Sequence, residues 1–211
     1  IISLILKHQP ELSVLTVILH DSHCVIDLSG FGRCSVSVIL PVLSAMGVQV
    51  CPVLTAVLST HTGGFGEVVF RDLTDYIKPS LEHYKNLDID FEAIYSGFLG
   101  SEEQVDSCLE FFKSYPNALK IVDPVMGDNG KLYPAFDEAF AKYMGTLCAK
   151  ADIIVPNITE AAFMTGIEYK ENYDEEYVKT MLKALAAAGI TAMPVVWNDE
   201  VNNCYPAIKF S

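Results

Sequence analysis

Short apolar segments rich in β-branched residues alternate with amphipathic segments along most of this sequence. In the amphipathic segments the apolar residues recur at helical spacing, as Val36, Ile39, Leu40 and Leu43 do. Strands that alternate with helices of about 12 residues are typical of a mostly parallel sheet with helices on both faces. No linker or low-complexity segment interrupts the pattern. We therefore expect an α/β fold in which residues 1–211 form a single domain.

The pattern also predicts where individual elements lie. Strands are expected at 14–19, 25–26, 48–50, 53–58, 93–95, 118–122, 152–155 and 190–196. Helices are expected at 35–46, 74–86, 101–113, 137–149 and 174–189. Ser101 and Gln104 fit a capping box, in which the Ser side chain meets a backbone amide and the Gln side chain reaches back. Glycines predict a turn at 27–33 and a loop at 60–66.

A net charge of −13 limits the kinds of partner that the chain can have. Only 14 Lys and Arg residues are present, and they are scattered, so neither a nucleic acid nor an anionic membrane is an expected partner. No charge lies between Arg33 and Glu67, but Gly47 and Pro52 divide this stretch, which favours a buried helix and strand over a membrane span. Six cysteines without a C-x-x-C pair are typical of reduced thiols in a cytoplasmic protein.

Polar residues, glycines and carboxylates directly follow several of the expected strands. In sheets of this kind, ligands bind at the carboxyl ends of the strands. Asp123 and Asp128 follow one strand and Glu160 follows another, so we expect three carboxylates at one edge of the sheet. Mg²⁺ prefers oxygen ligands and needs only one or two carboxylates in a nucleotide site. The sequence therefore favours Mg²⁺ as the metal.

Each of these residues also has a purely structural interpretation. Asp27 can end a strand in an Asx turn, and Thr55 can be an ordinary strand residue. Asn157 and Glu160 fit the capping box of a helix, and 128–130 is a turn pattern with or without a function. Both interpretations of Asn157 can hold together, because a helix N-terminus is itself an anion site.

Two other patterns are weak as sites. His20, His23 and Cys24 lie close together, but no second cluster completes a site for a soft metal. Residues 62–66 are rich in glycine, but they lack the lysine and the spacing of a phosphate-binding loop.

Five motifs taken together resemble one family. They are DLSGFGRCS at 27–35, STHTGGF at 59–65, SGFLG at 96–100, DPVMGD at 123–128 and PNITE at 156–160. In this order they resemble the pyridoxal kinase branch of the ribokinase-like family, over about residues 25–190. DPVMGD followed by PN-x-x-E is specific to the family, and the first two motifs narrow the resemblance to the vitamin B6 kinases.

The resemblance implies a role for each residue at the strand ends. Those implied to face or line the vitamin are Asp27 or Ser29, Thr55, Ser96 and Gly97. Those implied to hold Mg²⁺, directly or through water, are Asp128 and Glu160. Those implied to serve ATP are Asp123, near the phosphates at a monovalent cation such as K⁺, Asn157, on the phosphate chain, and 130–133 with Tyr133, as a flap.

The resemblance also implies an activity. ATP would transfer its γ-phosphoryl group to the 5′-hydroxymethyl group of pyridoxal, pyridoxine or pyridoxamine, in a cytoplasmic homodimer. Such transfers depend on positioning and charge neutralisation more than on covalent chemistry.

The catalytic segment of the family has no counterpart here. Its kinases carry Gly-Thr-Gly-Asp at a late helix, where amides bind the phosphoryl group and the Asp is the base. No glycine follows Gly189 in this sequence, and residues 192–211 match no part of the family, so the catalytic residue stays unassigned. We therefore expect an incomplete C-terminal part, because the chain is a piece of a longer one, is divergent, or is completed by a second chain.

Two alternatives stay open at this point. Hydroxymethylpyrimidine kinases share the fold and phosphorylate a similar heterocyclic alcohol, although DLSGFGRCS favours vitamin B6. A non-catalytic kinase-fold protein, which binds pyridoxal or a nucleotide without turnover, is favoured by the missing catalytic segment.

Overall fold

The computed structural model describes residues 21–32, 34–62 and 65–190, and the backbone of short strands at 193–194, 196–198 and 203–205. The described residues form two compact units, which meet in sequence between Lys120 and Ile121. Both units consist of strands and helices, as expected for an α/β fold. The expected strand at 14–19 lies outside the described residues, as do His20 and Arg33.

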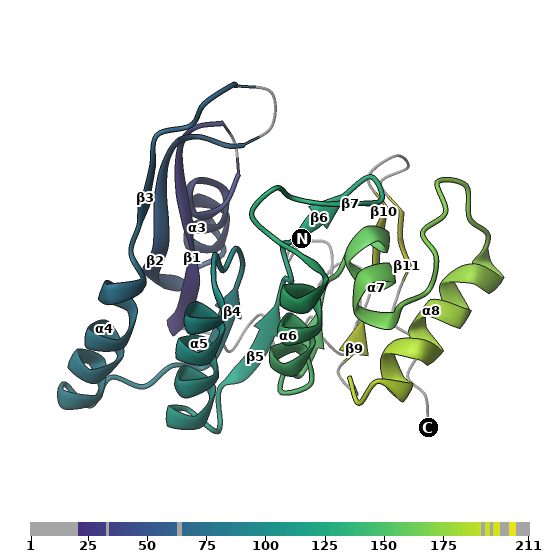
Figure 1. Cartoon of the computed structure of the whole chain (residues 1–211). Coiled ribbons are helices and arrows are strands. Elements are labelled where there is room, and N and C mark those ends of the chain that lie inside the picture. The colour runs from purple at the N-terminus through teal and green to yellow at the C-terminus, as the bar shows by residue number, and fades with distance from the viewer. Residues whose placement is uncertain are drawn as a thin grey trace. The chain divides into compact units, whose positions relative to one another are not determined.

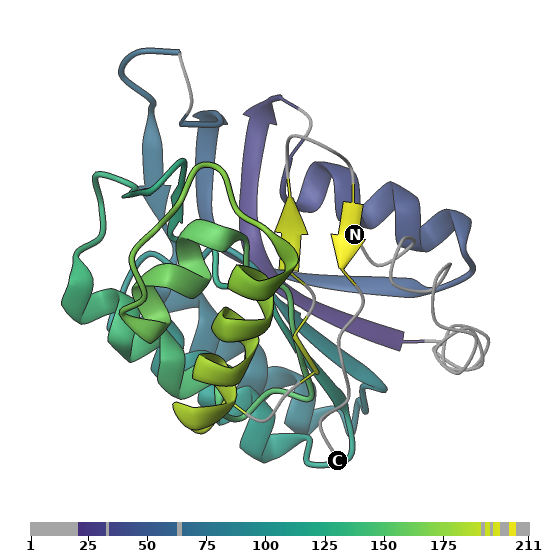
Figure 2. The same ribbon diagram turned by 90° about the vertical axis from the view of Figure 1, so that its right-hand side faces the viewer.

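The first unit contains four neighbouring strands of a sheet, in the order β3-β2-β1-β4. Its strands are β1 (Asp21–Phe31), β2 (Gln49–Thr60), β3 (Phe70–Asp72) and β4 (Ala93–Ser96). Strand β1 is parallel to both β2 and β4, whereas β3 is antiparallel to β2. The helices are α3 (Val36–Ala45), α4 (Thr74–Asn86) and α5 (Glu102–Ser114). Helix α3 lies on one face of the sheet and α4 and α5 on the other (Figure 1 and Figure 2).

Strand β1 is longer than the sequence predicted. The turn expected at 27–33 is wrong over most of its length, because β1 continues to Phe31, which pairs with Thr60 of β2. A register shift between Ile26 and Leu28 accommodates the glycine-containing segment within the ladder. Likewise, the two strands expected at 48–50 and 53–58 are the single strand β2, since Pro52 stays in register with Cys24.

An aromatic cluster fills the core of the first unit around His23. The imidazole is completely buried and stacks on Phe111, with 4.5 Å between the ring centroids. Phe91 and Tyr84 contact it at 4.8 and 5.5 Å. Burial lowers the pKa of His23 to about 3, against a smaller opposing contribution from the Cys51 backbone. His23 is therefore a neutral ring within this core.

The second unit contains three parallel strands in the order β5-β8-β9. They are β5 (Leu119–Val122), which begins at the unit boundary, β8 (Ile153–Ile154) and β9 (Met193–Pro194). Two hairpins accompany them: β6 (Gly127–Asp128) with β7 (Lys131–Leu132), and β10 (Val196–Asn198) with β11 (Asn203–Tyr205). The helices are α6 (Glu138–Cys148), α7 (Ile158–Thr165) and α8 (Glu175–Ala187), and α7 packs against both of the others.

The helix boundaries follow the capping residues of the sequence. Asp137 and Asp174 accept hydrogen bonds from the amides of Phe140 and Tyr177, each at 2.8 Å, and so begin α6 and α8. The expected capping box at Ser101 is only half correct. The Ser101 hydroxyl accepts from the Gln104 amide, but the Gln104 side chain accepts from the amide of Gly100 instead of that of Ser101.

The uncharged stretch between Arg33 and Glu67 contains α3 and β2. None of the helices in the described part of the chain is both long and apolar enough to cross a membrane.

Candidate functional site

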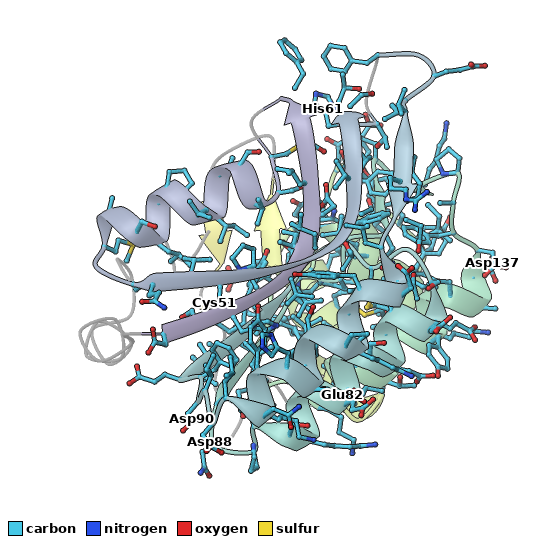
Figure 3. The ribbon with its side chains drawn as sticks, turned by 90° about the vertical axis from the view of Figure 1, so that its left-hand side faces the viewer. Cys51, His61, Glu82, Asp88, Asp90 and Asp137 are labelled. Carbon is cyan, nitrogen blue, oxygen red and sulfur yellow. The ribbon has the colours of Figure 1, made fainter. Side chains whose placement is uncertain are left out.

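Four of the five residues expected at the vitamin come together at one edge of the first unit. Val25 of β1 lies opposite both Val53 of β2 and Ser96 of β4. Asp27, Ser29, Thr55 and Ser96 therefore gather towards the carboxyl ends of three adjacent strands, and all four are buried. Figure 3 labels His61, which directly follows β2, and Cys51, which lies near the start of that strand.

Asp27 is a carboxyl in an environment that disfavours its charge. It is 5% exposed, and burial raises its pKa, against the opposing effect of hydrogen bonds with Ser35 and Ser29. The Ser29 hydroxyl donates to Asp27 Oδ2 at 3.2 Å. The Asx turn that the sequence allowed at Asp27 is not formed, because Asp27 lies within β1. A buried, hydrogen-bonded carboxyl of this kind can accept a hydrogen bond from a polar ligand.

Thr55 has a structural partner. Its hydroxyl donates to the carbonyl of Phe98 at 2.8 Å and so joins β2 to the segment after β4. Its hydrogen is thereby used, and only the lone pairs of Oγ1 are left to face a ligand.

Gln104 joins the same segments, although its sequence context predicts only a capping role. Its side chain is completely buried at the start of α5. The Nε2 amide lies 3.0 Å from the Thr55 carbonyl, 2.8 Å from Thr74 Oγ1 and 3.3 Å from Asp72 Oδ2. Because an amide NH₂ has two hydrogens, the two shorter contacts satisfy it. The available signal was a polar side chain at the third residue of α5.

Gly97 and Ser96 are tightly packed. A Cβ at Gly97 would lie 2.5 Å from Cδ1 of Ile26, so close packing against β1 requires a glycine there. The Ser96 hydroxyl is completely buried and makes no hydrogen bond of standard geometry within the described residues. Both residues therefore have a packing role beside β1, whatever their role in binding.

In the second unit, Asn157 and Glu160 form the capping box that the sequence allowed. Asn157 Oδ1 accepts from the Glu160 amide at 2.9 Å, and Glu160 Oε2 accepts from the Asn157 amide at 2.8 Å. The box begins α7, and Gly166 ends the helix in the left-handed conformation.

The capping residues also hold the β6–β7 hairpin. Asn157 Nδ2 donates to the Gly127 carbonyl at 2.9 Å, and the Met126 amide donates to Glu160 Oε1 at 3.3 Å. Thr159 Oγ1 accepts from the amide of Gly130 at 2.9 Å. Nothing in the sequence indicates this role of Thr159, because its partner Gly130 lies 29 residues away in the chain.

The hairpin confirms the turn predicted at 128–130. Asn129 and Gly130 both have positive φ, 50° and 73°, and they connect the paired residues Asp128 and Lys131. Asn-Gly with positive φ at both positions is the favoured two-residue hairpin turn. Tyr133 follows, and its amide donates to the Met126 carbonyl at 2.9 Å.

Glu160 is the most perturbed carboxyl of the second unit. It is 3% exposed, and its pKa lies well above the ordinary value, first because of burial and then because of the charge on Asp123. Hydrogen bonds from the backbone amides of Asn157 and Met126 oppose the shift, and Asp128 adds to it. Asp123 and Asp128 are themselves half-buried. The charges of Asp123 and Asp128 both act on Glu160, so these three carboxyls are electrostatic neighbours.

This arrangement suits Mg²⁺ better than a metal that needs a closed protein cage. Within the described ranges, no three His, Cys, Asp or Glu side chains converge closely enough to enclose a metal ion. Mg²⁺ keeps most of its waters and binds through one or two carboxylates together with phosphate oxygens. The acids Asp199 and Glu200 of the tail lie outside the described residues.

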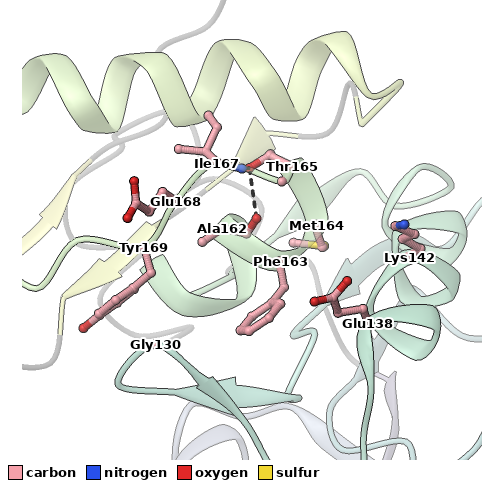
Figure 4. A pocket seen from close by; sticks show the side chains of 11 residues that line it. Gly130, Glu138, Lys142, Ala162, Phe163, Met164, Thr165, Ile167, Glu168 and Tyr169 are labelled. Carbon is pink, nitrogen blue, oxygen red and sulfur yellow. Dashed lines mark hydrogen bonds between the residues drawn. The ribbon is translucent and has the colours of Figure 1, made fainter.

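A cavity of about 510 Å³ lies behind the hairpin, between α6 and the end of α7. Glu138 and Lys142 line it from α6, and Phe163 and Tyr169 from α7 and the segment after it (Figure 4). Tyr169 also contacts Gly130, since a Cβ on that glycine would lie 2.6 Å from Tyr169 Cδ1. The cavity therefore adjoins the turn that follows Asp128.

Comparisons with known proteins identify the family of the chain. Residues 40–196 match the phosphomethylpyrimidine kinase family. A candidate phosphomethylpyrimidine kinase from Bacteroides thetaiotaomicron, solved with pyridoxal, is 39% identical, with a TM-score of 0.79 over 87% of this chain and 65% of that one. The pyridoxal kinase of Lactobacillus plantarum is 32% identical, with a TM-score of 0.76 over 90% of this chain and 72% of that one.

Curated relatives extend the similarity to eukaryotes. The pyridoxal kinase of Dictyostelium discoideum is 29% identical over 139 residues, which cover 63% of this chain and 45% of that protein. The chain thus spans about half the length of the curated relatives that it matches. The matched family and these relatives agree: the chain belongs to the phosphomethylpyrimidine kinase family, in the pyridoxal kinase branch of the ribokinase-like superfamily.

Proposed function

We propose that the protein to which this chain belongs is an ATP-dependent kinase of vitamin B6. It would phosphorylate the 5′-hydroxymethyl group of pyridoxal, pyridoxine or pyridoxamine and so form pyridoxal 5′-phosphate from pyridoxal. The observation that carries this proposal is the likeness to a structure solved with pyridoxal, at 39% identity over most of the chain.

The vitamin would lie at the edge formed by β1, β2 and β4. Asp27 or Ser29 would contact the polar substituents of the ring, and Thr55 would offer the lone pairs of its hydroxyl oxygen. Ser96 and Gly97 would form the wall beside them. The burial of Asp27 supports this assignment, because a ligand hydroxyl or pyridine N–H is a suitable partner for a carboxyl removed from water.

The nucleotide would lie in the second unit. Asp128 and Glu160 would hold Mg²⁺, which neutralises charge on the phosphates when it is bound. Asp123 would lie near the phosphates with K⁺, Asn157 would contact the phosphate chain, and 130–133 with Tyr133 would cover the nucleotide. The raised pKa of Glu160 supports a cation at this place, because a nearby positive charge would relieve the repulsion among the three carboxyls.

The direct test uses this 211-residue chain with pyridoxal, ATP and Mg²⁺, and follows pyridoxal phosphate by absorbance. Hydroxymethylpyrimidine is the competing alcohol, since the matched family carries the name of a pyrimidine kinase. Faster turnover of hydroxymethylpyrimidine than of pyridoxal would mean that the substrate is the pyrimidine and not the vitamin. Binding of pyridoxal or ATP by calorimetry without turnover would instead favour the non-catalytic alternative, because the Gly-Thr-Gly-Asp segment is absent from the sequence.

We also propose that the protein is a cytoplasmic homodimer. Val38 and Val42 lie one helical turn apart on α3, and each is about two-fifths exposed. Exposed apolar side chains on one helix face are unfavourable in water and are commonly covered by another protein surface. Light scattering on the purified chain measures its mass, and a monomer that persists at high concentration would contradict the dimer.

A further inference from the structure

Two layers of contact hold the β6–β7 hairpin against α7. Asn157 and Glu160 bind its base, at the Gly127 carbonyl and the Met126 amide. Thr159 binds the tip of the hairpin, which is the turn at 129–130. Its Oγ1 accepts a hydrogen bond from the Gly130 amide at 2.9 Å. Thr159 is 2% exposed, so water competes little for this bond.

Gly130 is held from its other side by an aromatic ring. Its φ of 73° favours glycine, and a Cβ would lie 2.6 Å from Cδ1 and 2.9 Å from Cε1 of Tyr169. Figure 4 shows Tyr169 on the segment after α7, beside the turn at Gly130. The turn residue is therefore fixed by one hydrogen bond to Thr159 and by close packing on Tyr169.

The carboxylate of Asp128 is tied to the same turn. Its Oδ1 accepts from the Asn129 amide at 2.8 Å, and its Oδ2 lies 3.0 Å from Asn129 Nδ2. Each strand of the hairpin has only two residues, and an isolated two-stranded hairpin is marginally stable in water. Contacts from α7 must therefore determine where the turn, and with it Asp128, lies relative to Glu160.

We infer that Thr159 is a positioning residue, which fixes the turn at 129–130 so that Asp128 and Glu160 can bind the same Mg²⁺–nucleotide. Glu160 lies on the same turn of α7 as Thr159, so a single helical turn carries one metal-binding carboxyl and places the other. The metal in this inference rests on the proposed function. The anchor, which is the hydrogen bond from the Gly130 amide to Thr159 Oγ1, rests only on the described contacts.

The anchor is tested first, without any ligand. Thr159→Val keeps the shape of the side chain and removes the acceptor, and Thr159→Ser restores the acceptor. We expect hydrogen exchange of the Gly130 amide, measured by NMR, to accelerate about fivefold to tenfold in the valine variant and to return towards the original rate in the serine variant. Thr180→Val is the matched control, because Thr180 is exposed on α8 and its hydroxyl bonds only the local Glu176 carbonyl. Equal Gly130 exchange in the Thr159→Val variant and the original chain would overturn the anchor.

Binding then tests the consequence for the metal. Calorimetry with ATP in Mg²⁺ and with ATP in EDTA separates metal-dependent from metal-independent affinity. We expect Thr159→Val to weaken Mg²⁺–ATP binding about fivefold, to leave ATP in EDTA unchanged, and to be rescued by serine. Equal losses with and without Mg²⁺ would show a general structural role and would overturn the positioning of Asp128. If the original chain itself shows no Mg²⁺-dependent binding, the proposed metal site fails, while the Gly130 exchange rate still decides whether Thr159 holds the turn.

Discussion

The hydroxyl of Thr55 donates a hydrogen bond of 2.8 Å to the carbonyl of Phe98, and this bond joins β2 to the segment that follows β4. This bond gives a residue of the candidate vitamin site a second, structural task. Any substitution at Thr55 must therefore be interpreted through both stability and binding.

Thr55→Val should lower the free energy of unfolding by about 1–2 kcal/mol, because the Phe98 carbonyl loses its donor in a buried site. It should also weaken pyridoxal binding more than ATP binding, since Thr55 belongs to the first unit and its oxygen would face the vitamin. Urea unfolding and calorimetry measure the two effects, with Thr55→Ser as the conservative control. Equal losses of affinity for pyridoxal and for ATP would show that Thr55 has only a structural role.

Gln104→Leu should destabilise the chain on the order of 2–4 kcal/mol, because the Gly100 amide and the Thr55 carbonyl both lose buried partners. Gln49→Leu, on the exposed start of β2, should change stability by about 0.5 kcal/mol or less. Urea unfolding of both variants makes the comparison. Similar effects at the two positions would contradict the role of Gln104 as the link between these segments.

His23 should make the chain sensitive to acid. Its pKa is about 3 in the fold and about 6.5 when unfolded, so the unfolded chain takes up a proton that the folded chain does not. The stabilising contribution is present above pH 6.5 and is lost at about 1.4 kcal/mol per pH unit as the pH falls from 6.5 towards 3. Asp27 and Glu160 act in the opposite direction, since their pKa values are raised.

The His23 contribution can be isolated by difference. Urea unfolding of His23→Phe and of the original chain is measured between pH 4.5 and 7.5. The stability of the original chain relative to the variant should fall as the pH drops below about 6.5, because phenylalanine takes up no proton on unfolding. His83→Phe is the control, since His83 is exposed on α4. Parallel curves for His23→Phe and the original chain would mean that His23 is not neutral and buried in solution.

Asp128→Asn should weaken Mg²⁺-dependent ATP binding about tenfold with little change in stability, because the half-buried carboxylate that we propose as a metal ligand loses its charge while its hydrogen bonds to Asn129 persist in part. Glu160→Gln should weaken it too and should also destabilise α7, since one backbone amide of the capping box loses its acceptor. Glu171→Gln, at an exposed carboxyl, is the control. Unchanged Mg²⁺-dependent affinity in both site variants would remove the metal assignment.

Local chemistry allowed several elements to be predicted closely. The helix expected at 74–86 has those same bounds, and Asp137, Asn157 and Asp174 begin the helices that their capping side chains predicted. Asn129 and Gly130 form the predicted turn, because Asn and Gly tolerate positive φ. Each of these features depends on residues within a few positions of one another, so the sequence contains all the information that they need.

Other features depended on distant partners and could not be predicted. The glycines at 27–33 indicated a turn, but twelve residues of β2 offer backbone partners that extend β1 to Phe31. Gln104 fits a capping box locally, yet its side chain binds Gly100, Thr55 and Thr74 because folding brings those groups around it.

The sequence alone determined the alternating α/β pattern, the caps of its helices, and the family resemblance that makes Asp27, Thr55, Asp128 and Glu160 candidate site residues. Only the tertiary structure decided which hydroxyls and amides serve those residues, as Thr159 serves the turn after Asp128 and Gln104 serves Thr55. The reason is physical: a cap or a turn is satisfied by neighbours along the chain, whereas a buried polar group takes whatever partner the packing of separate segments places within reach.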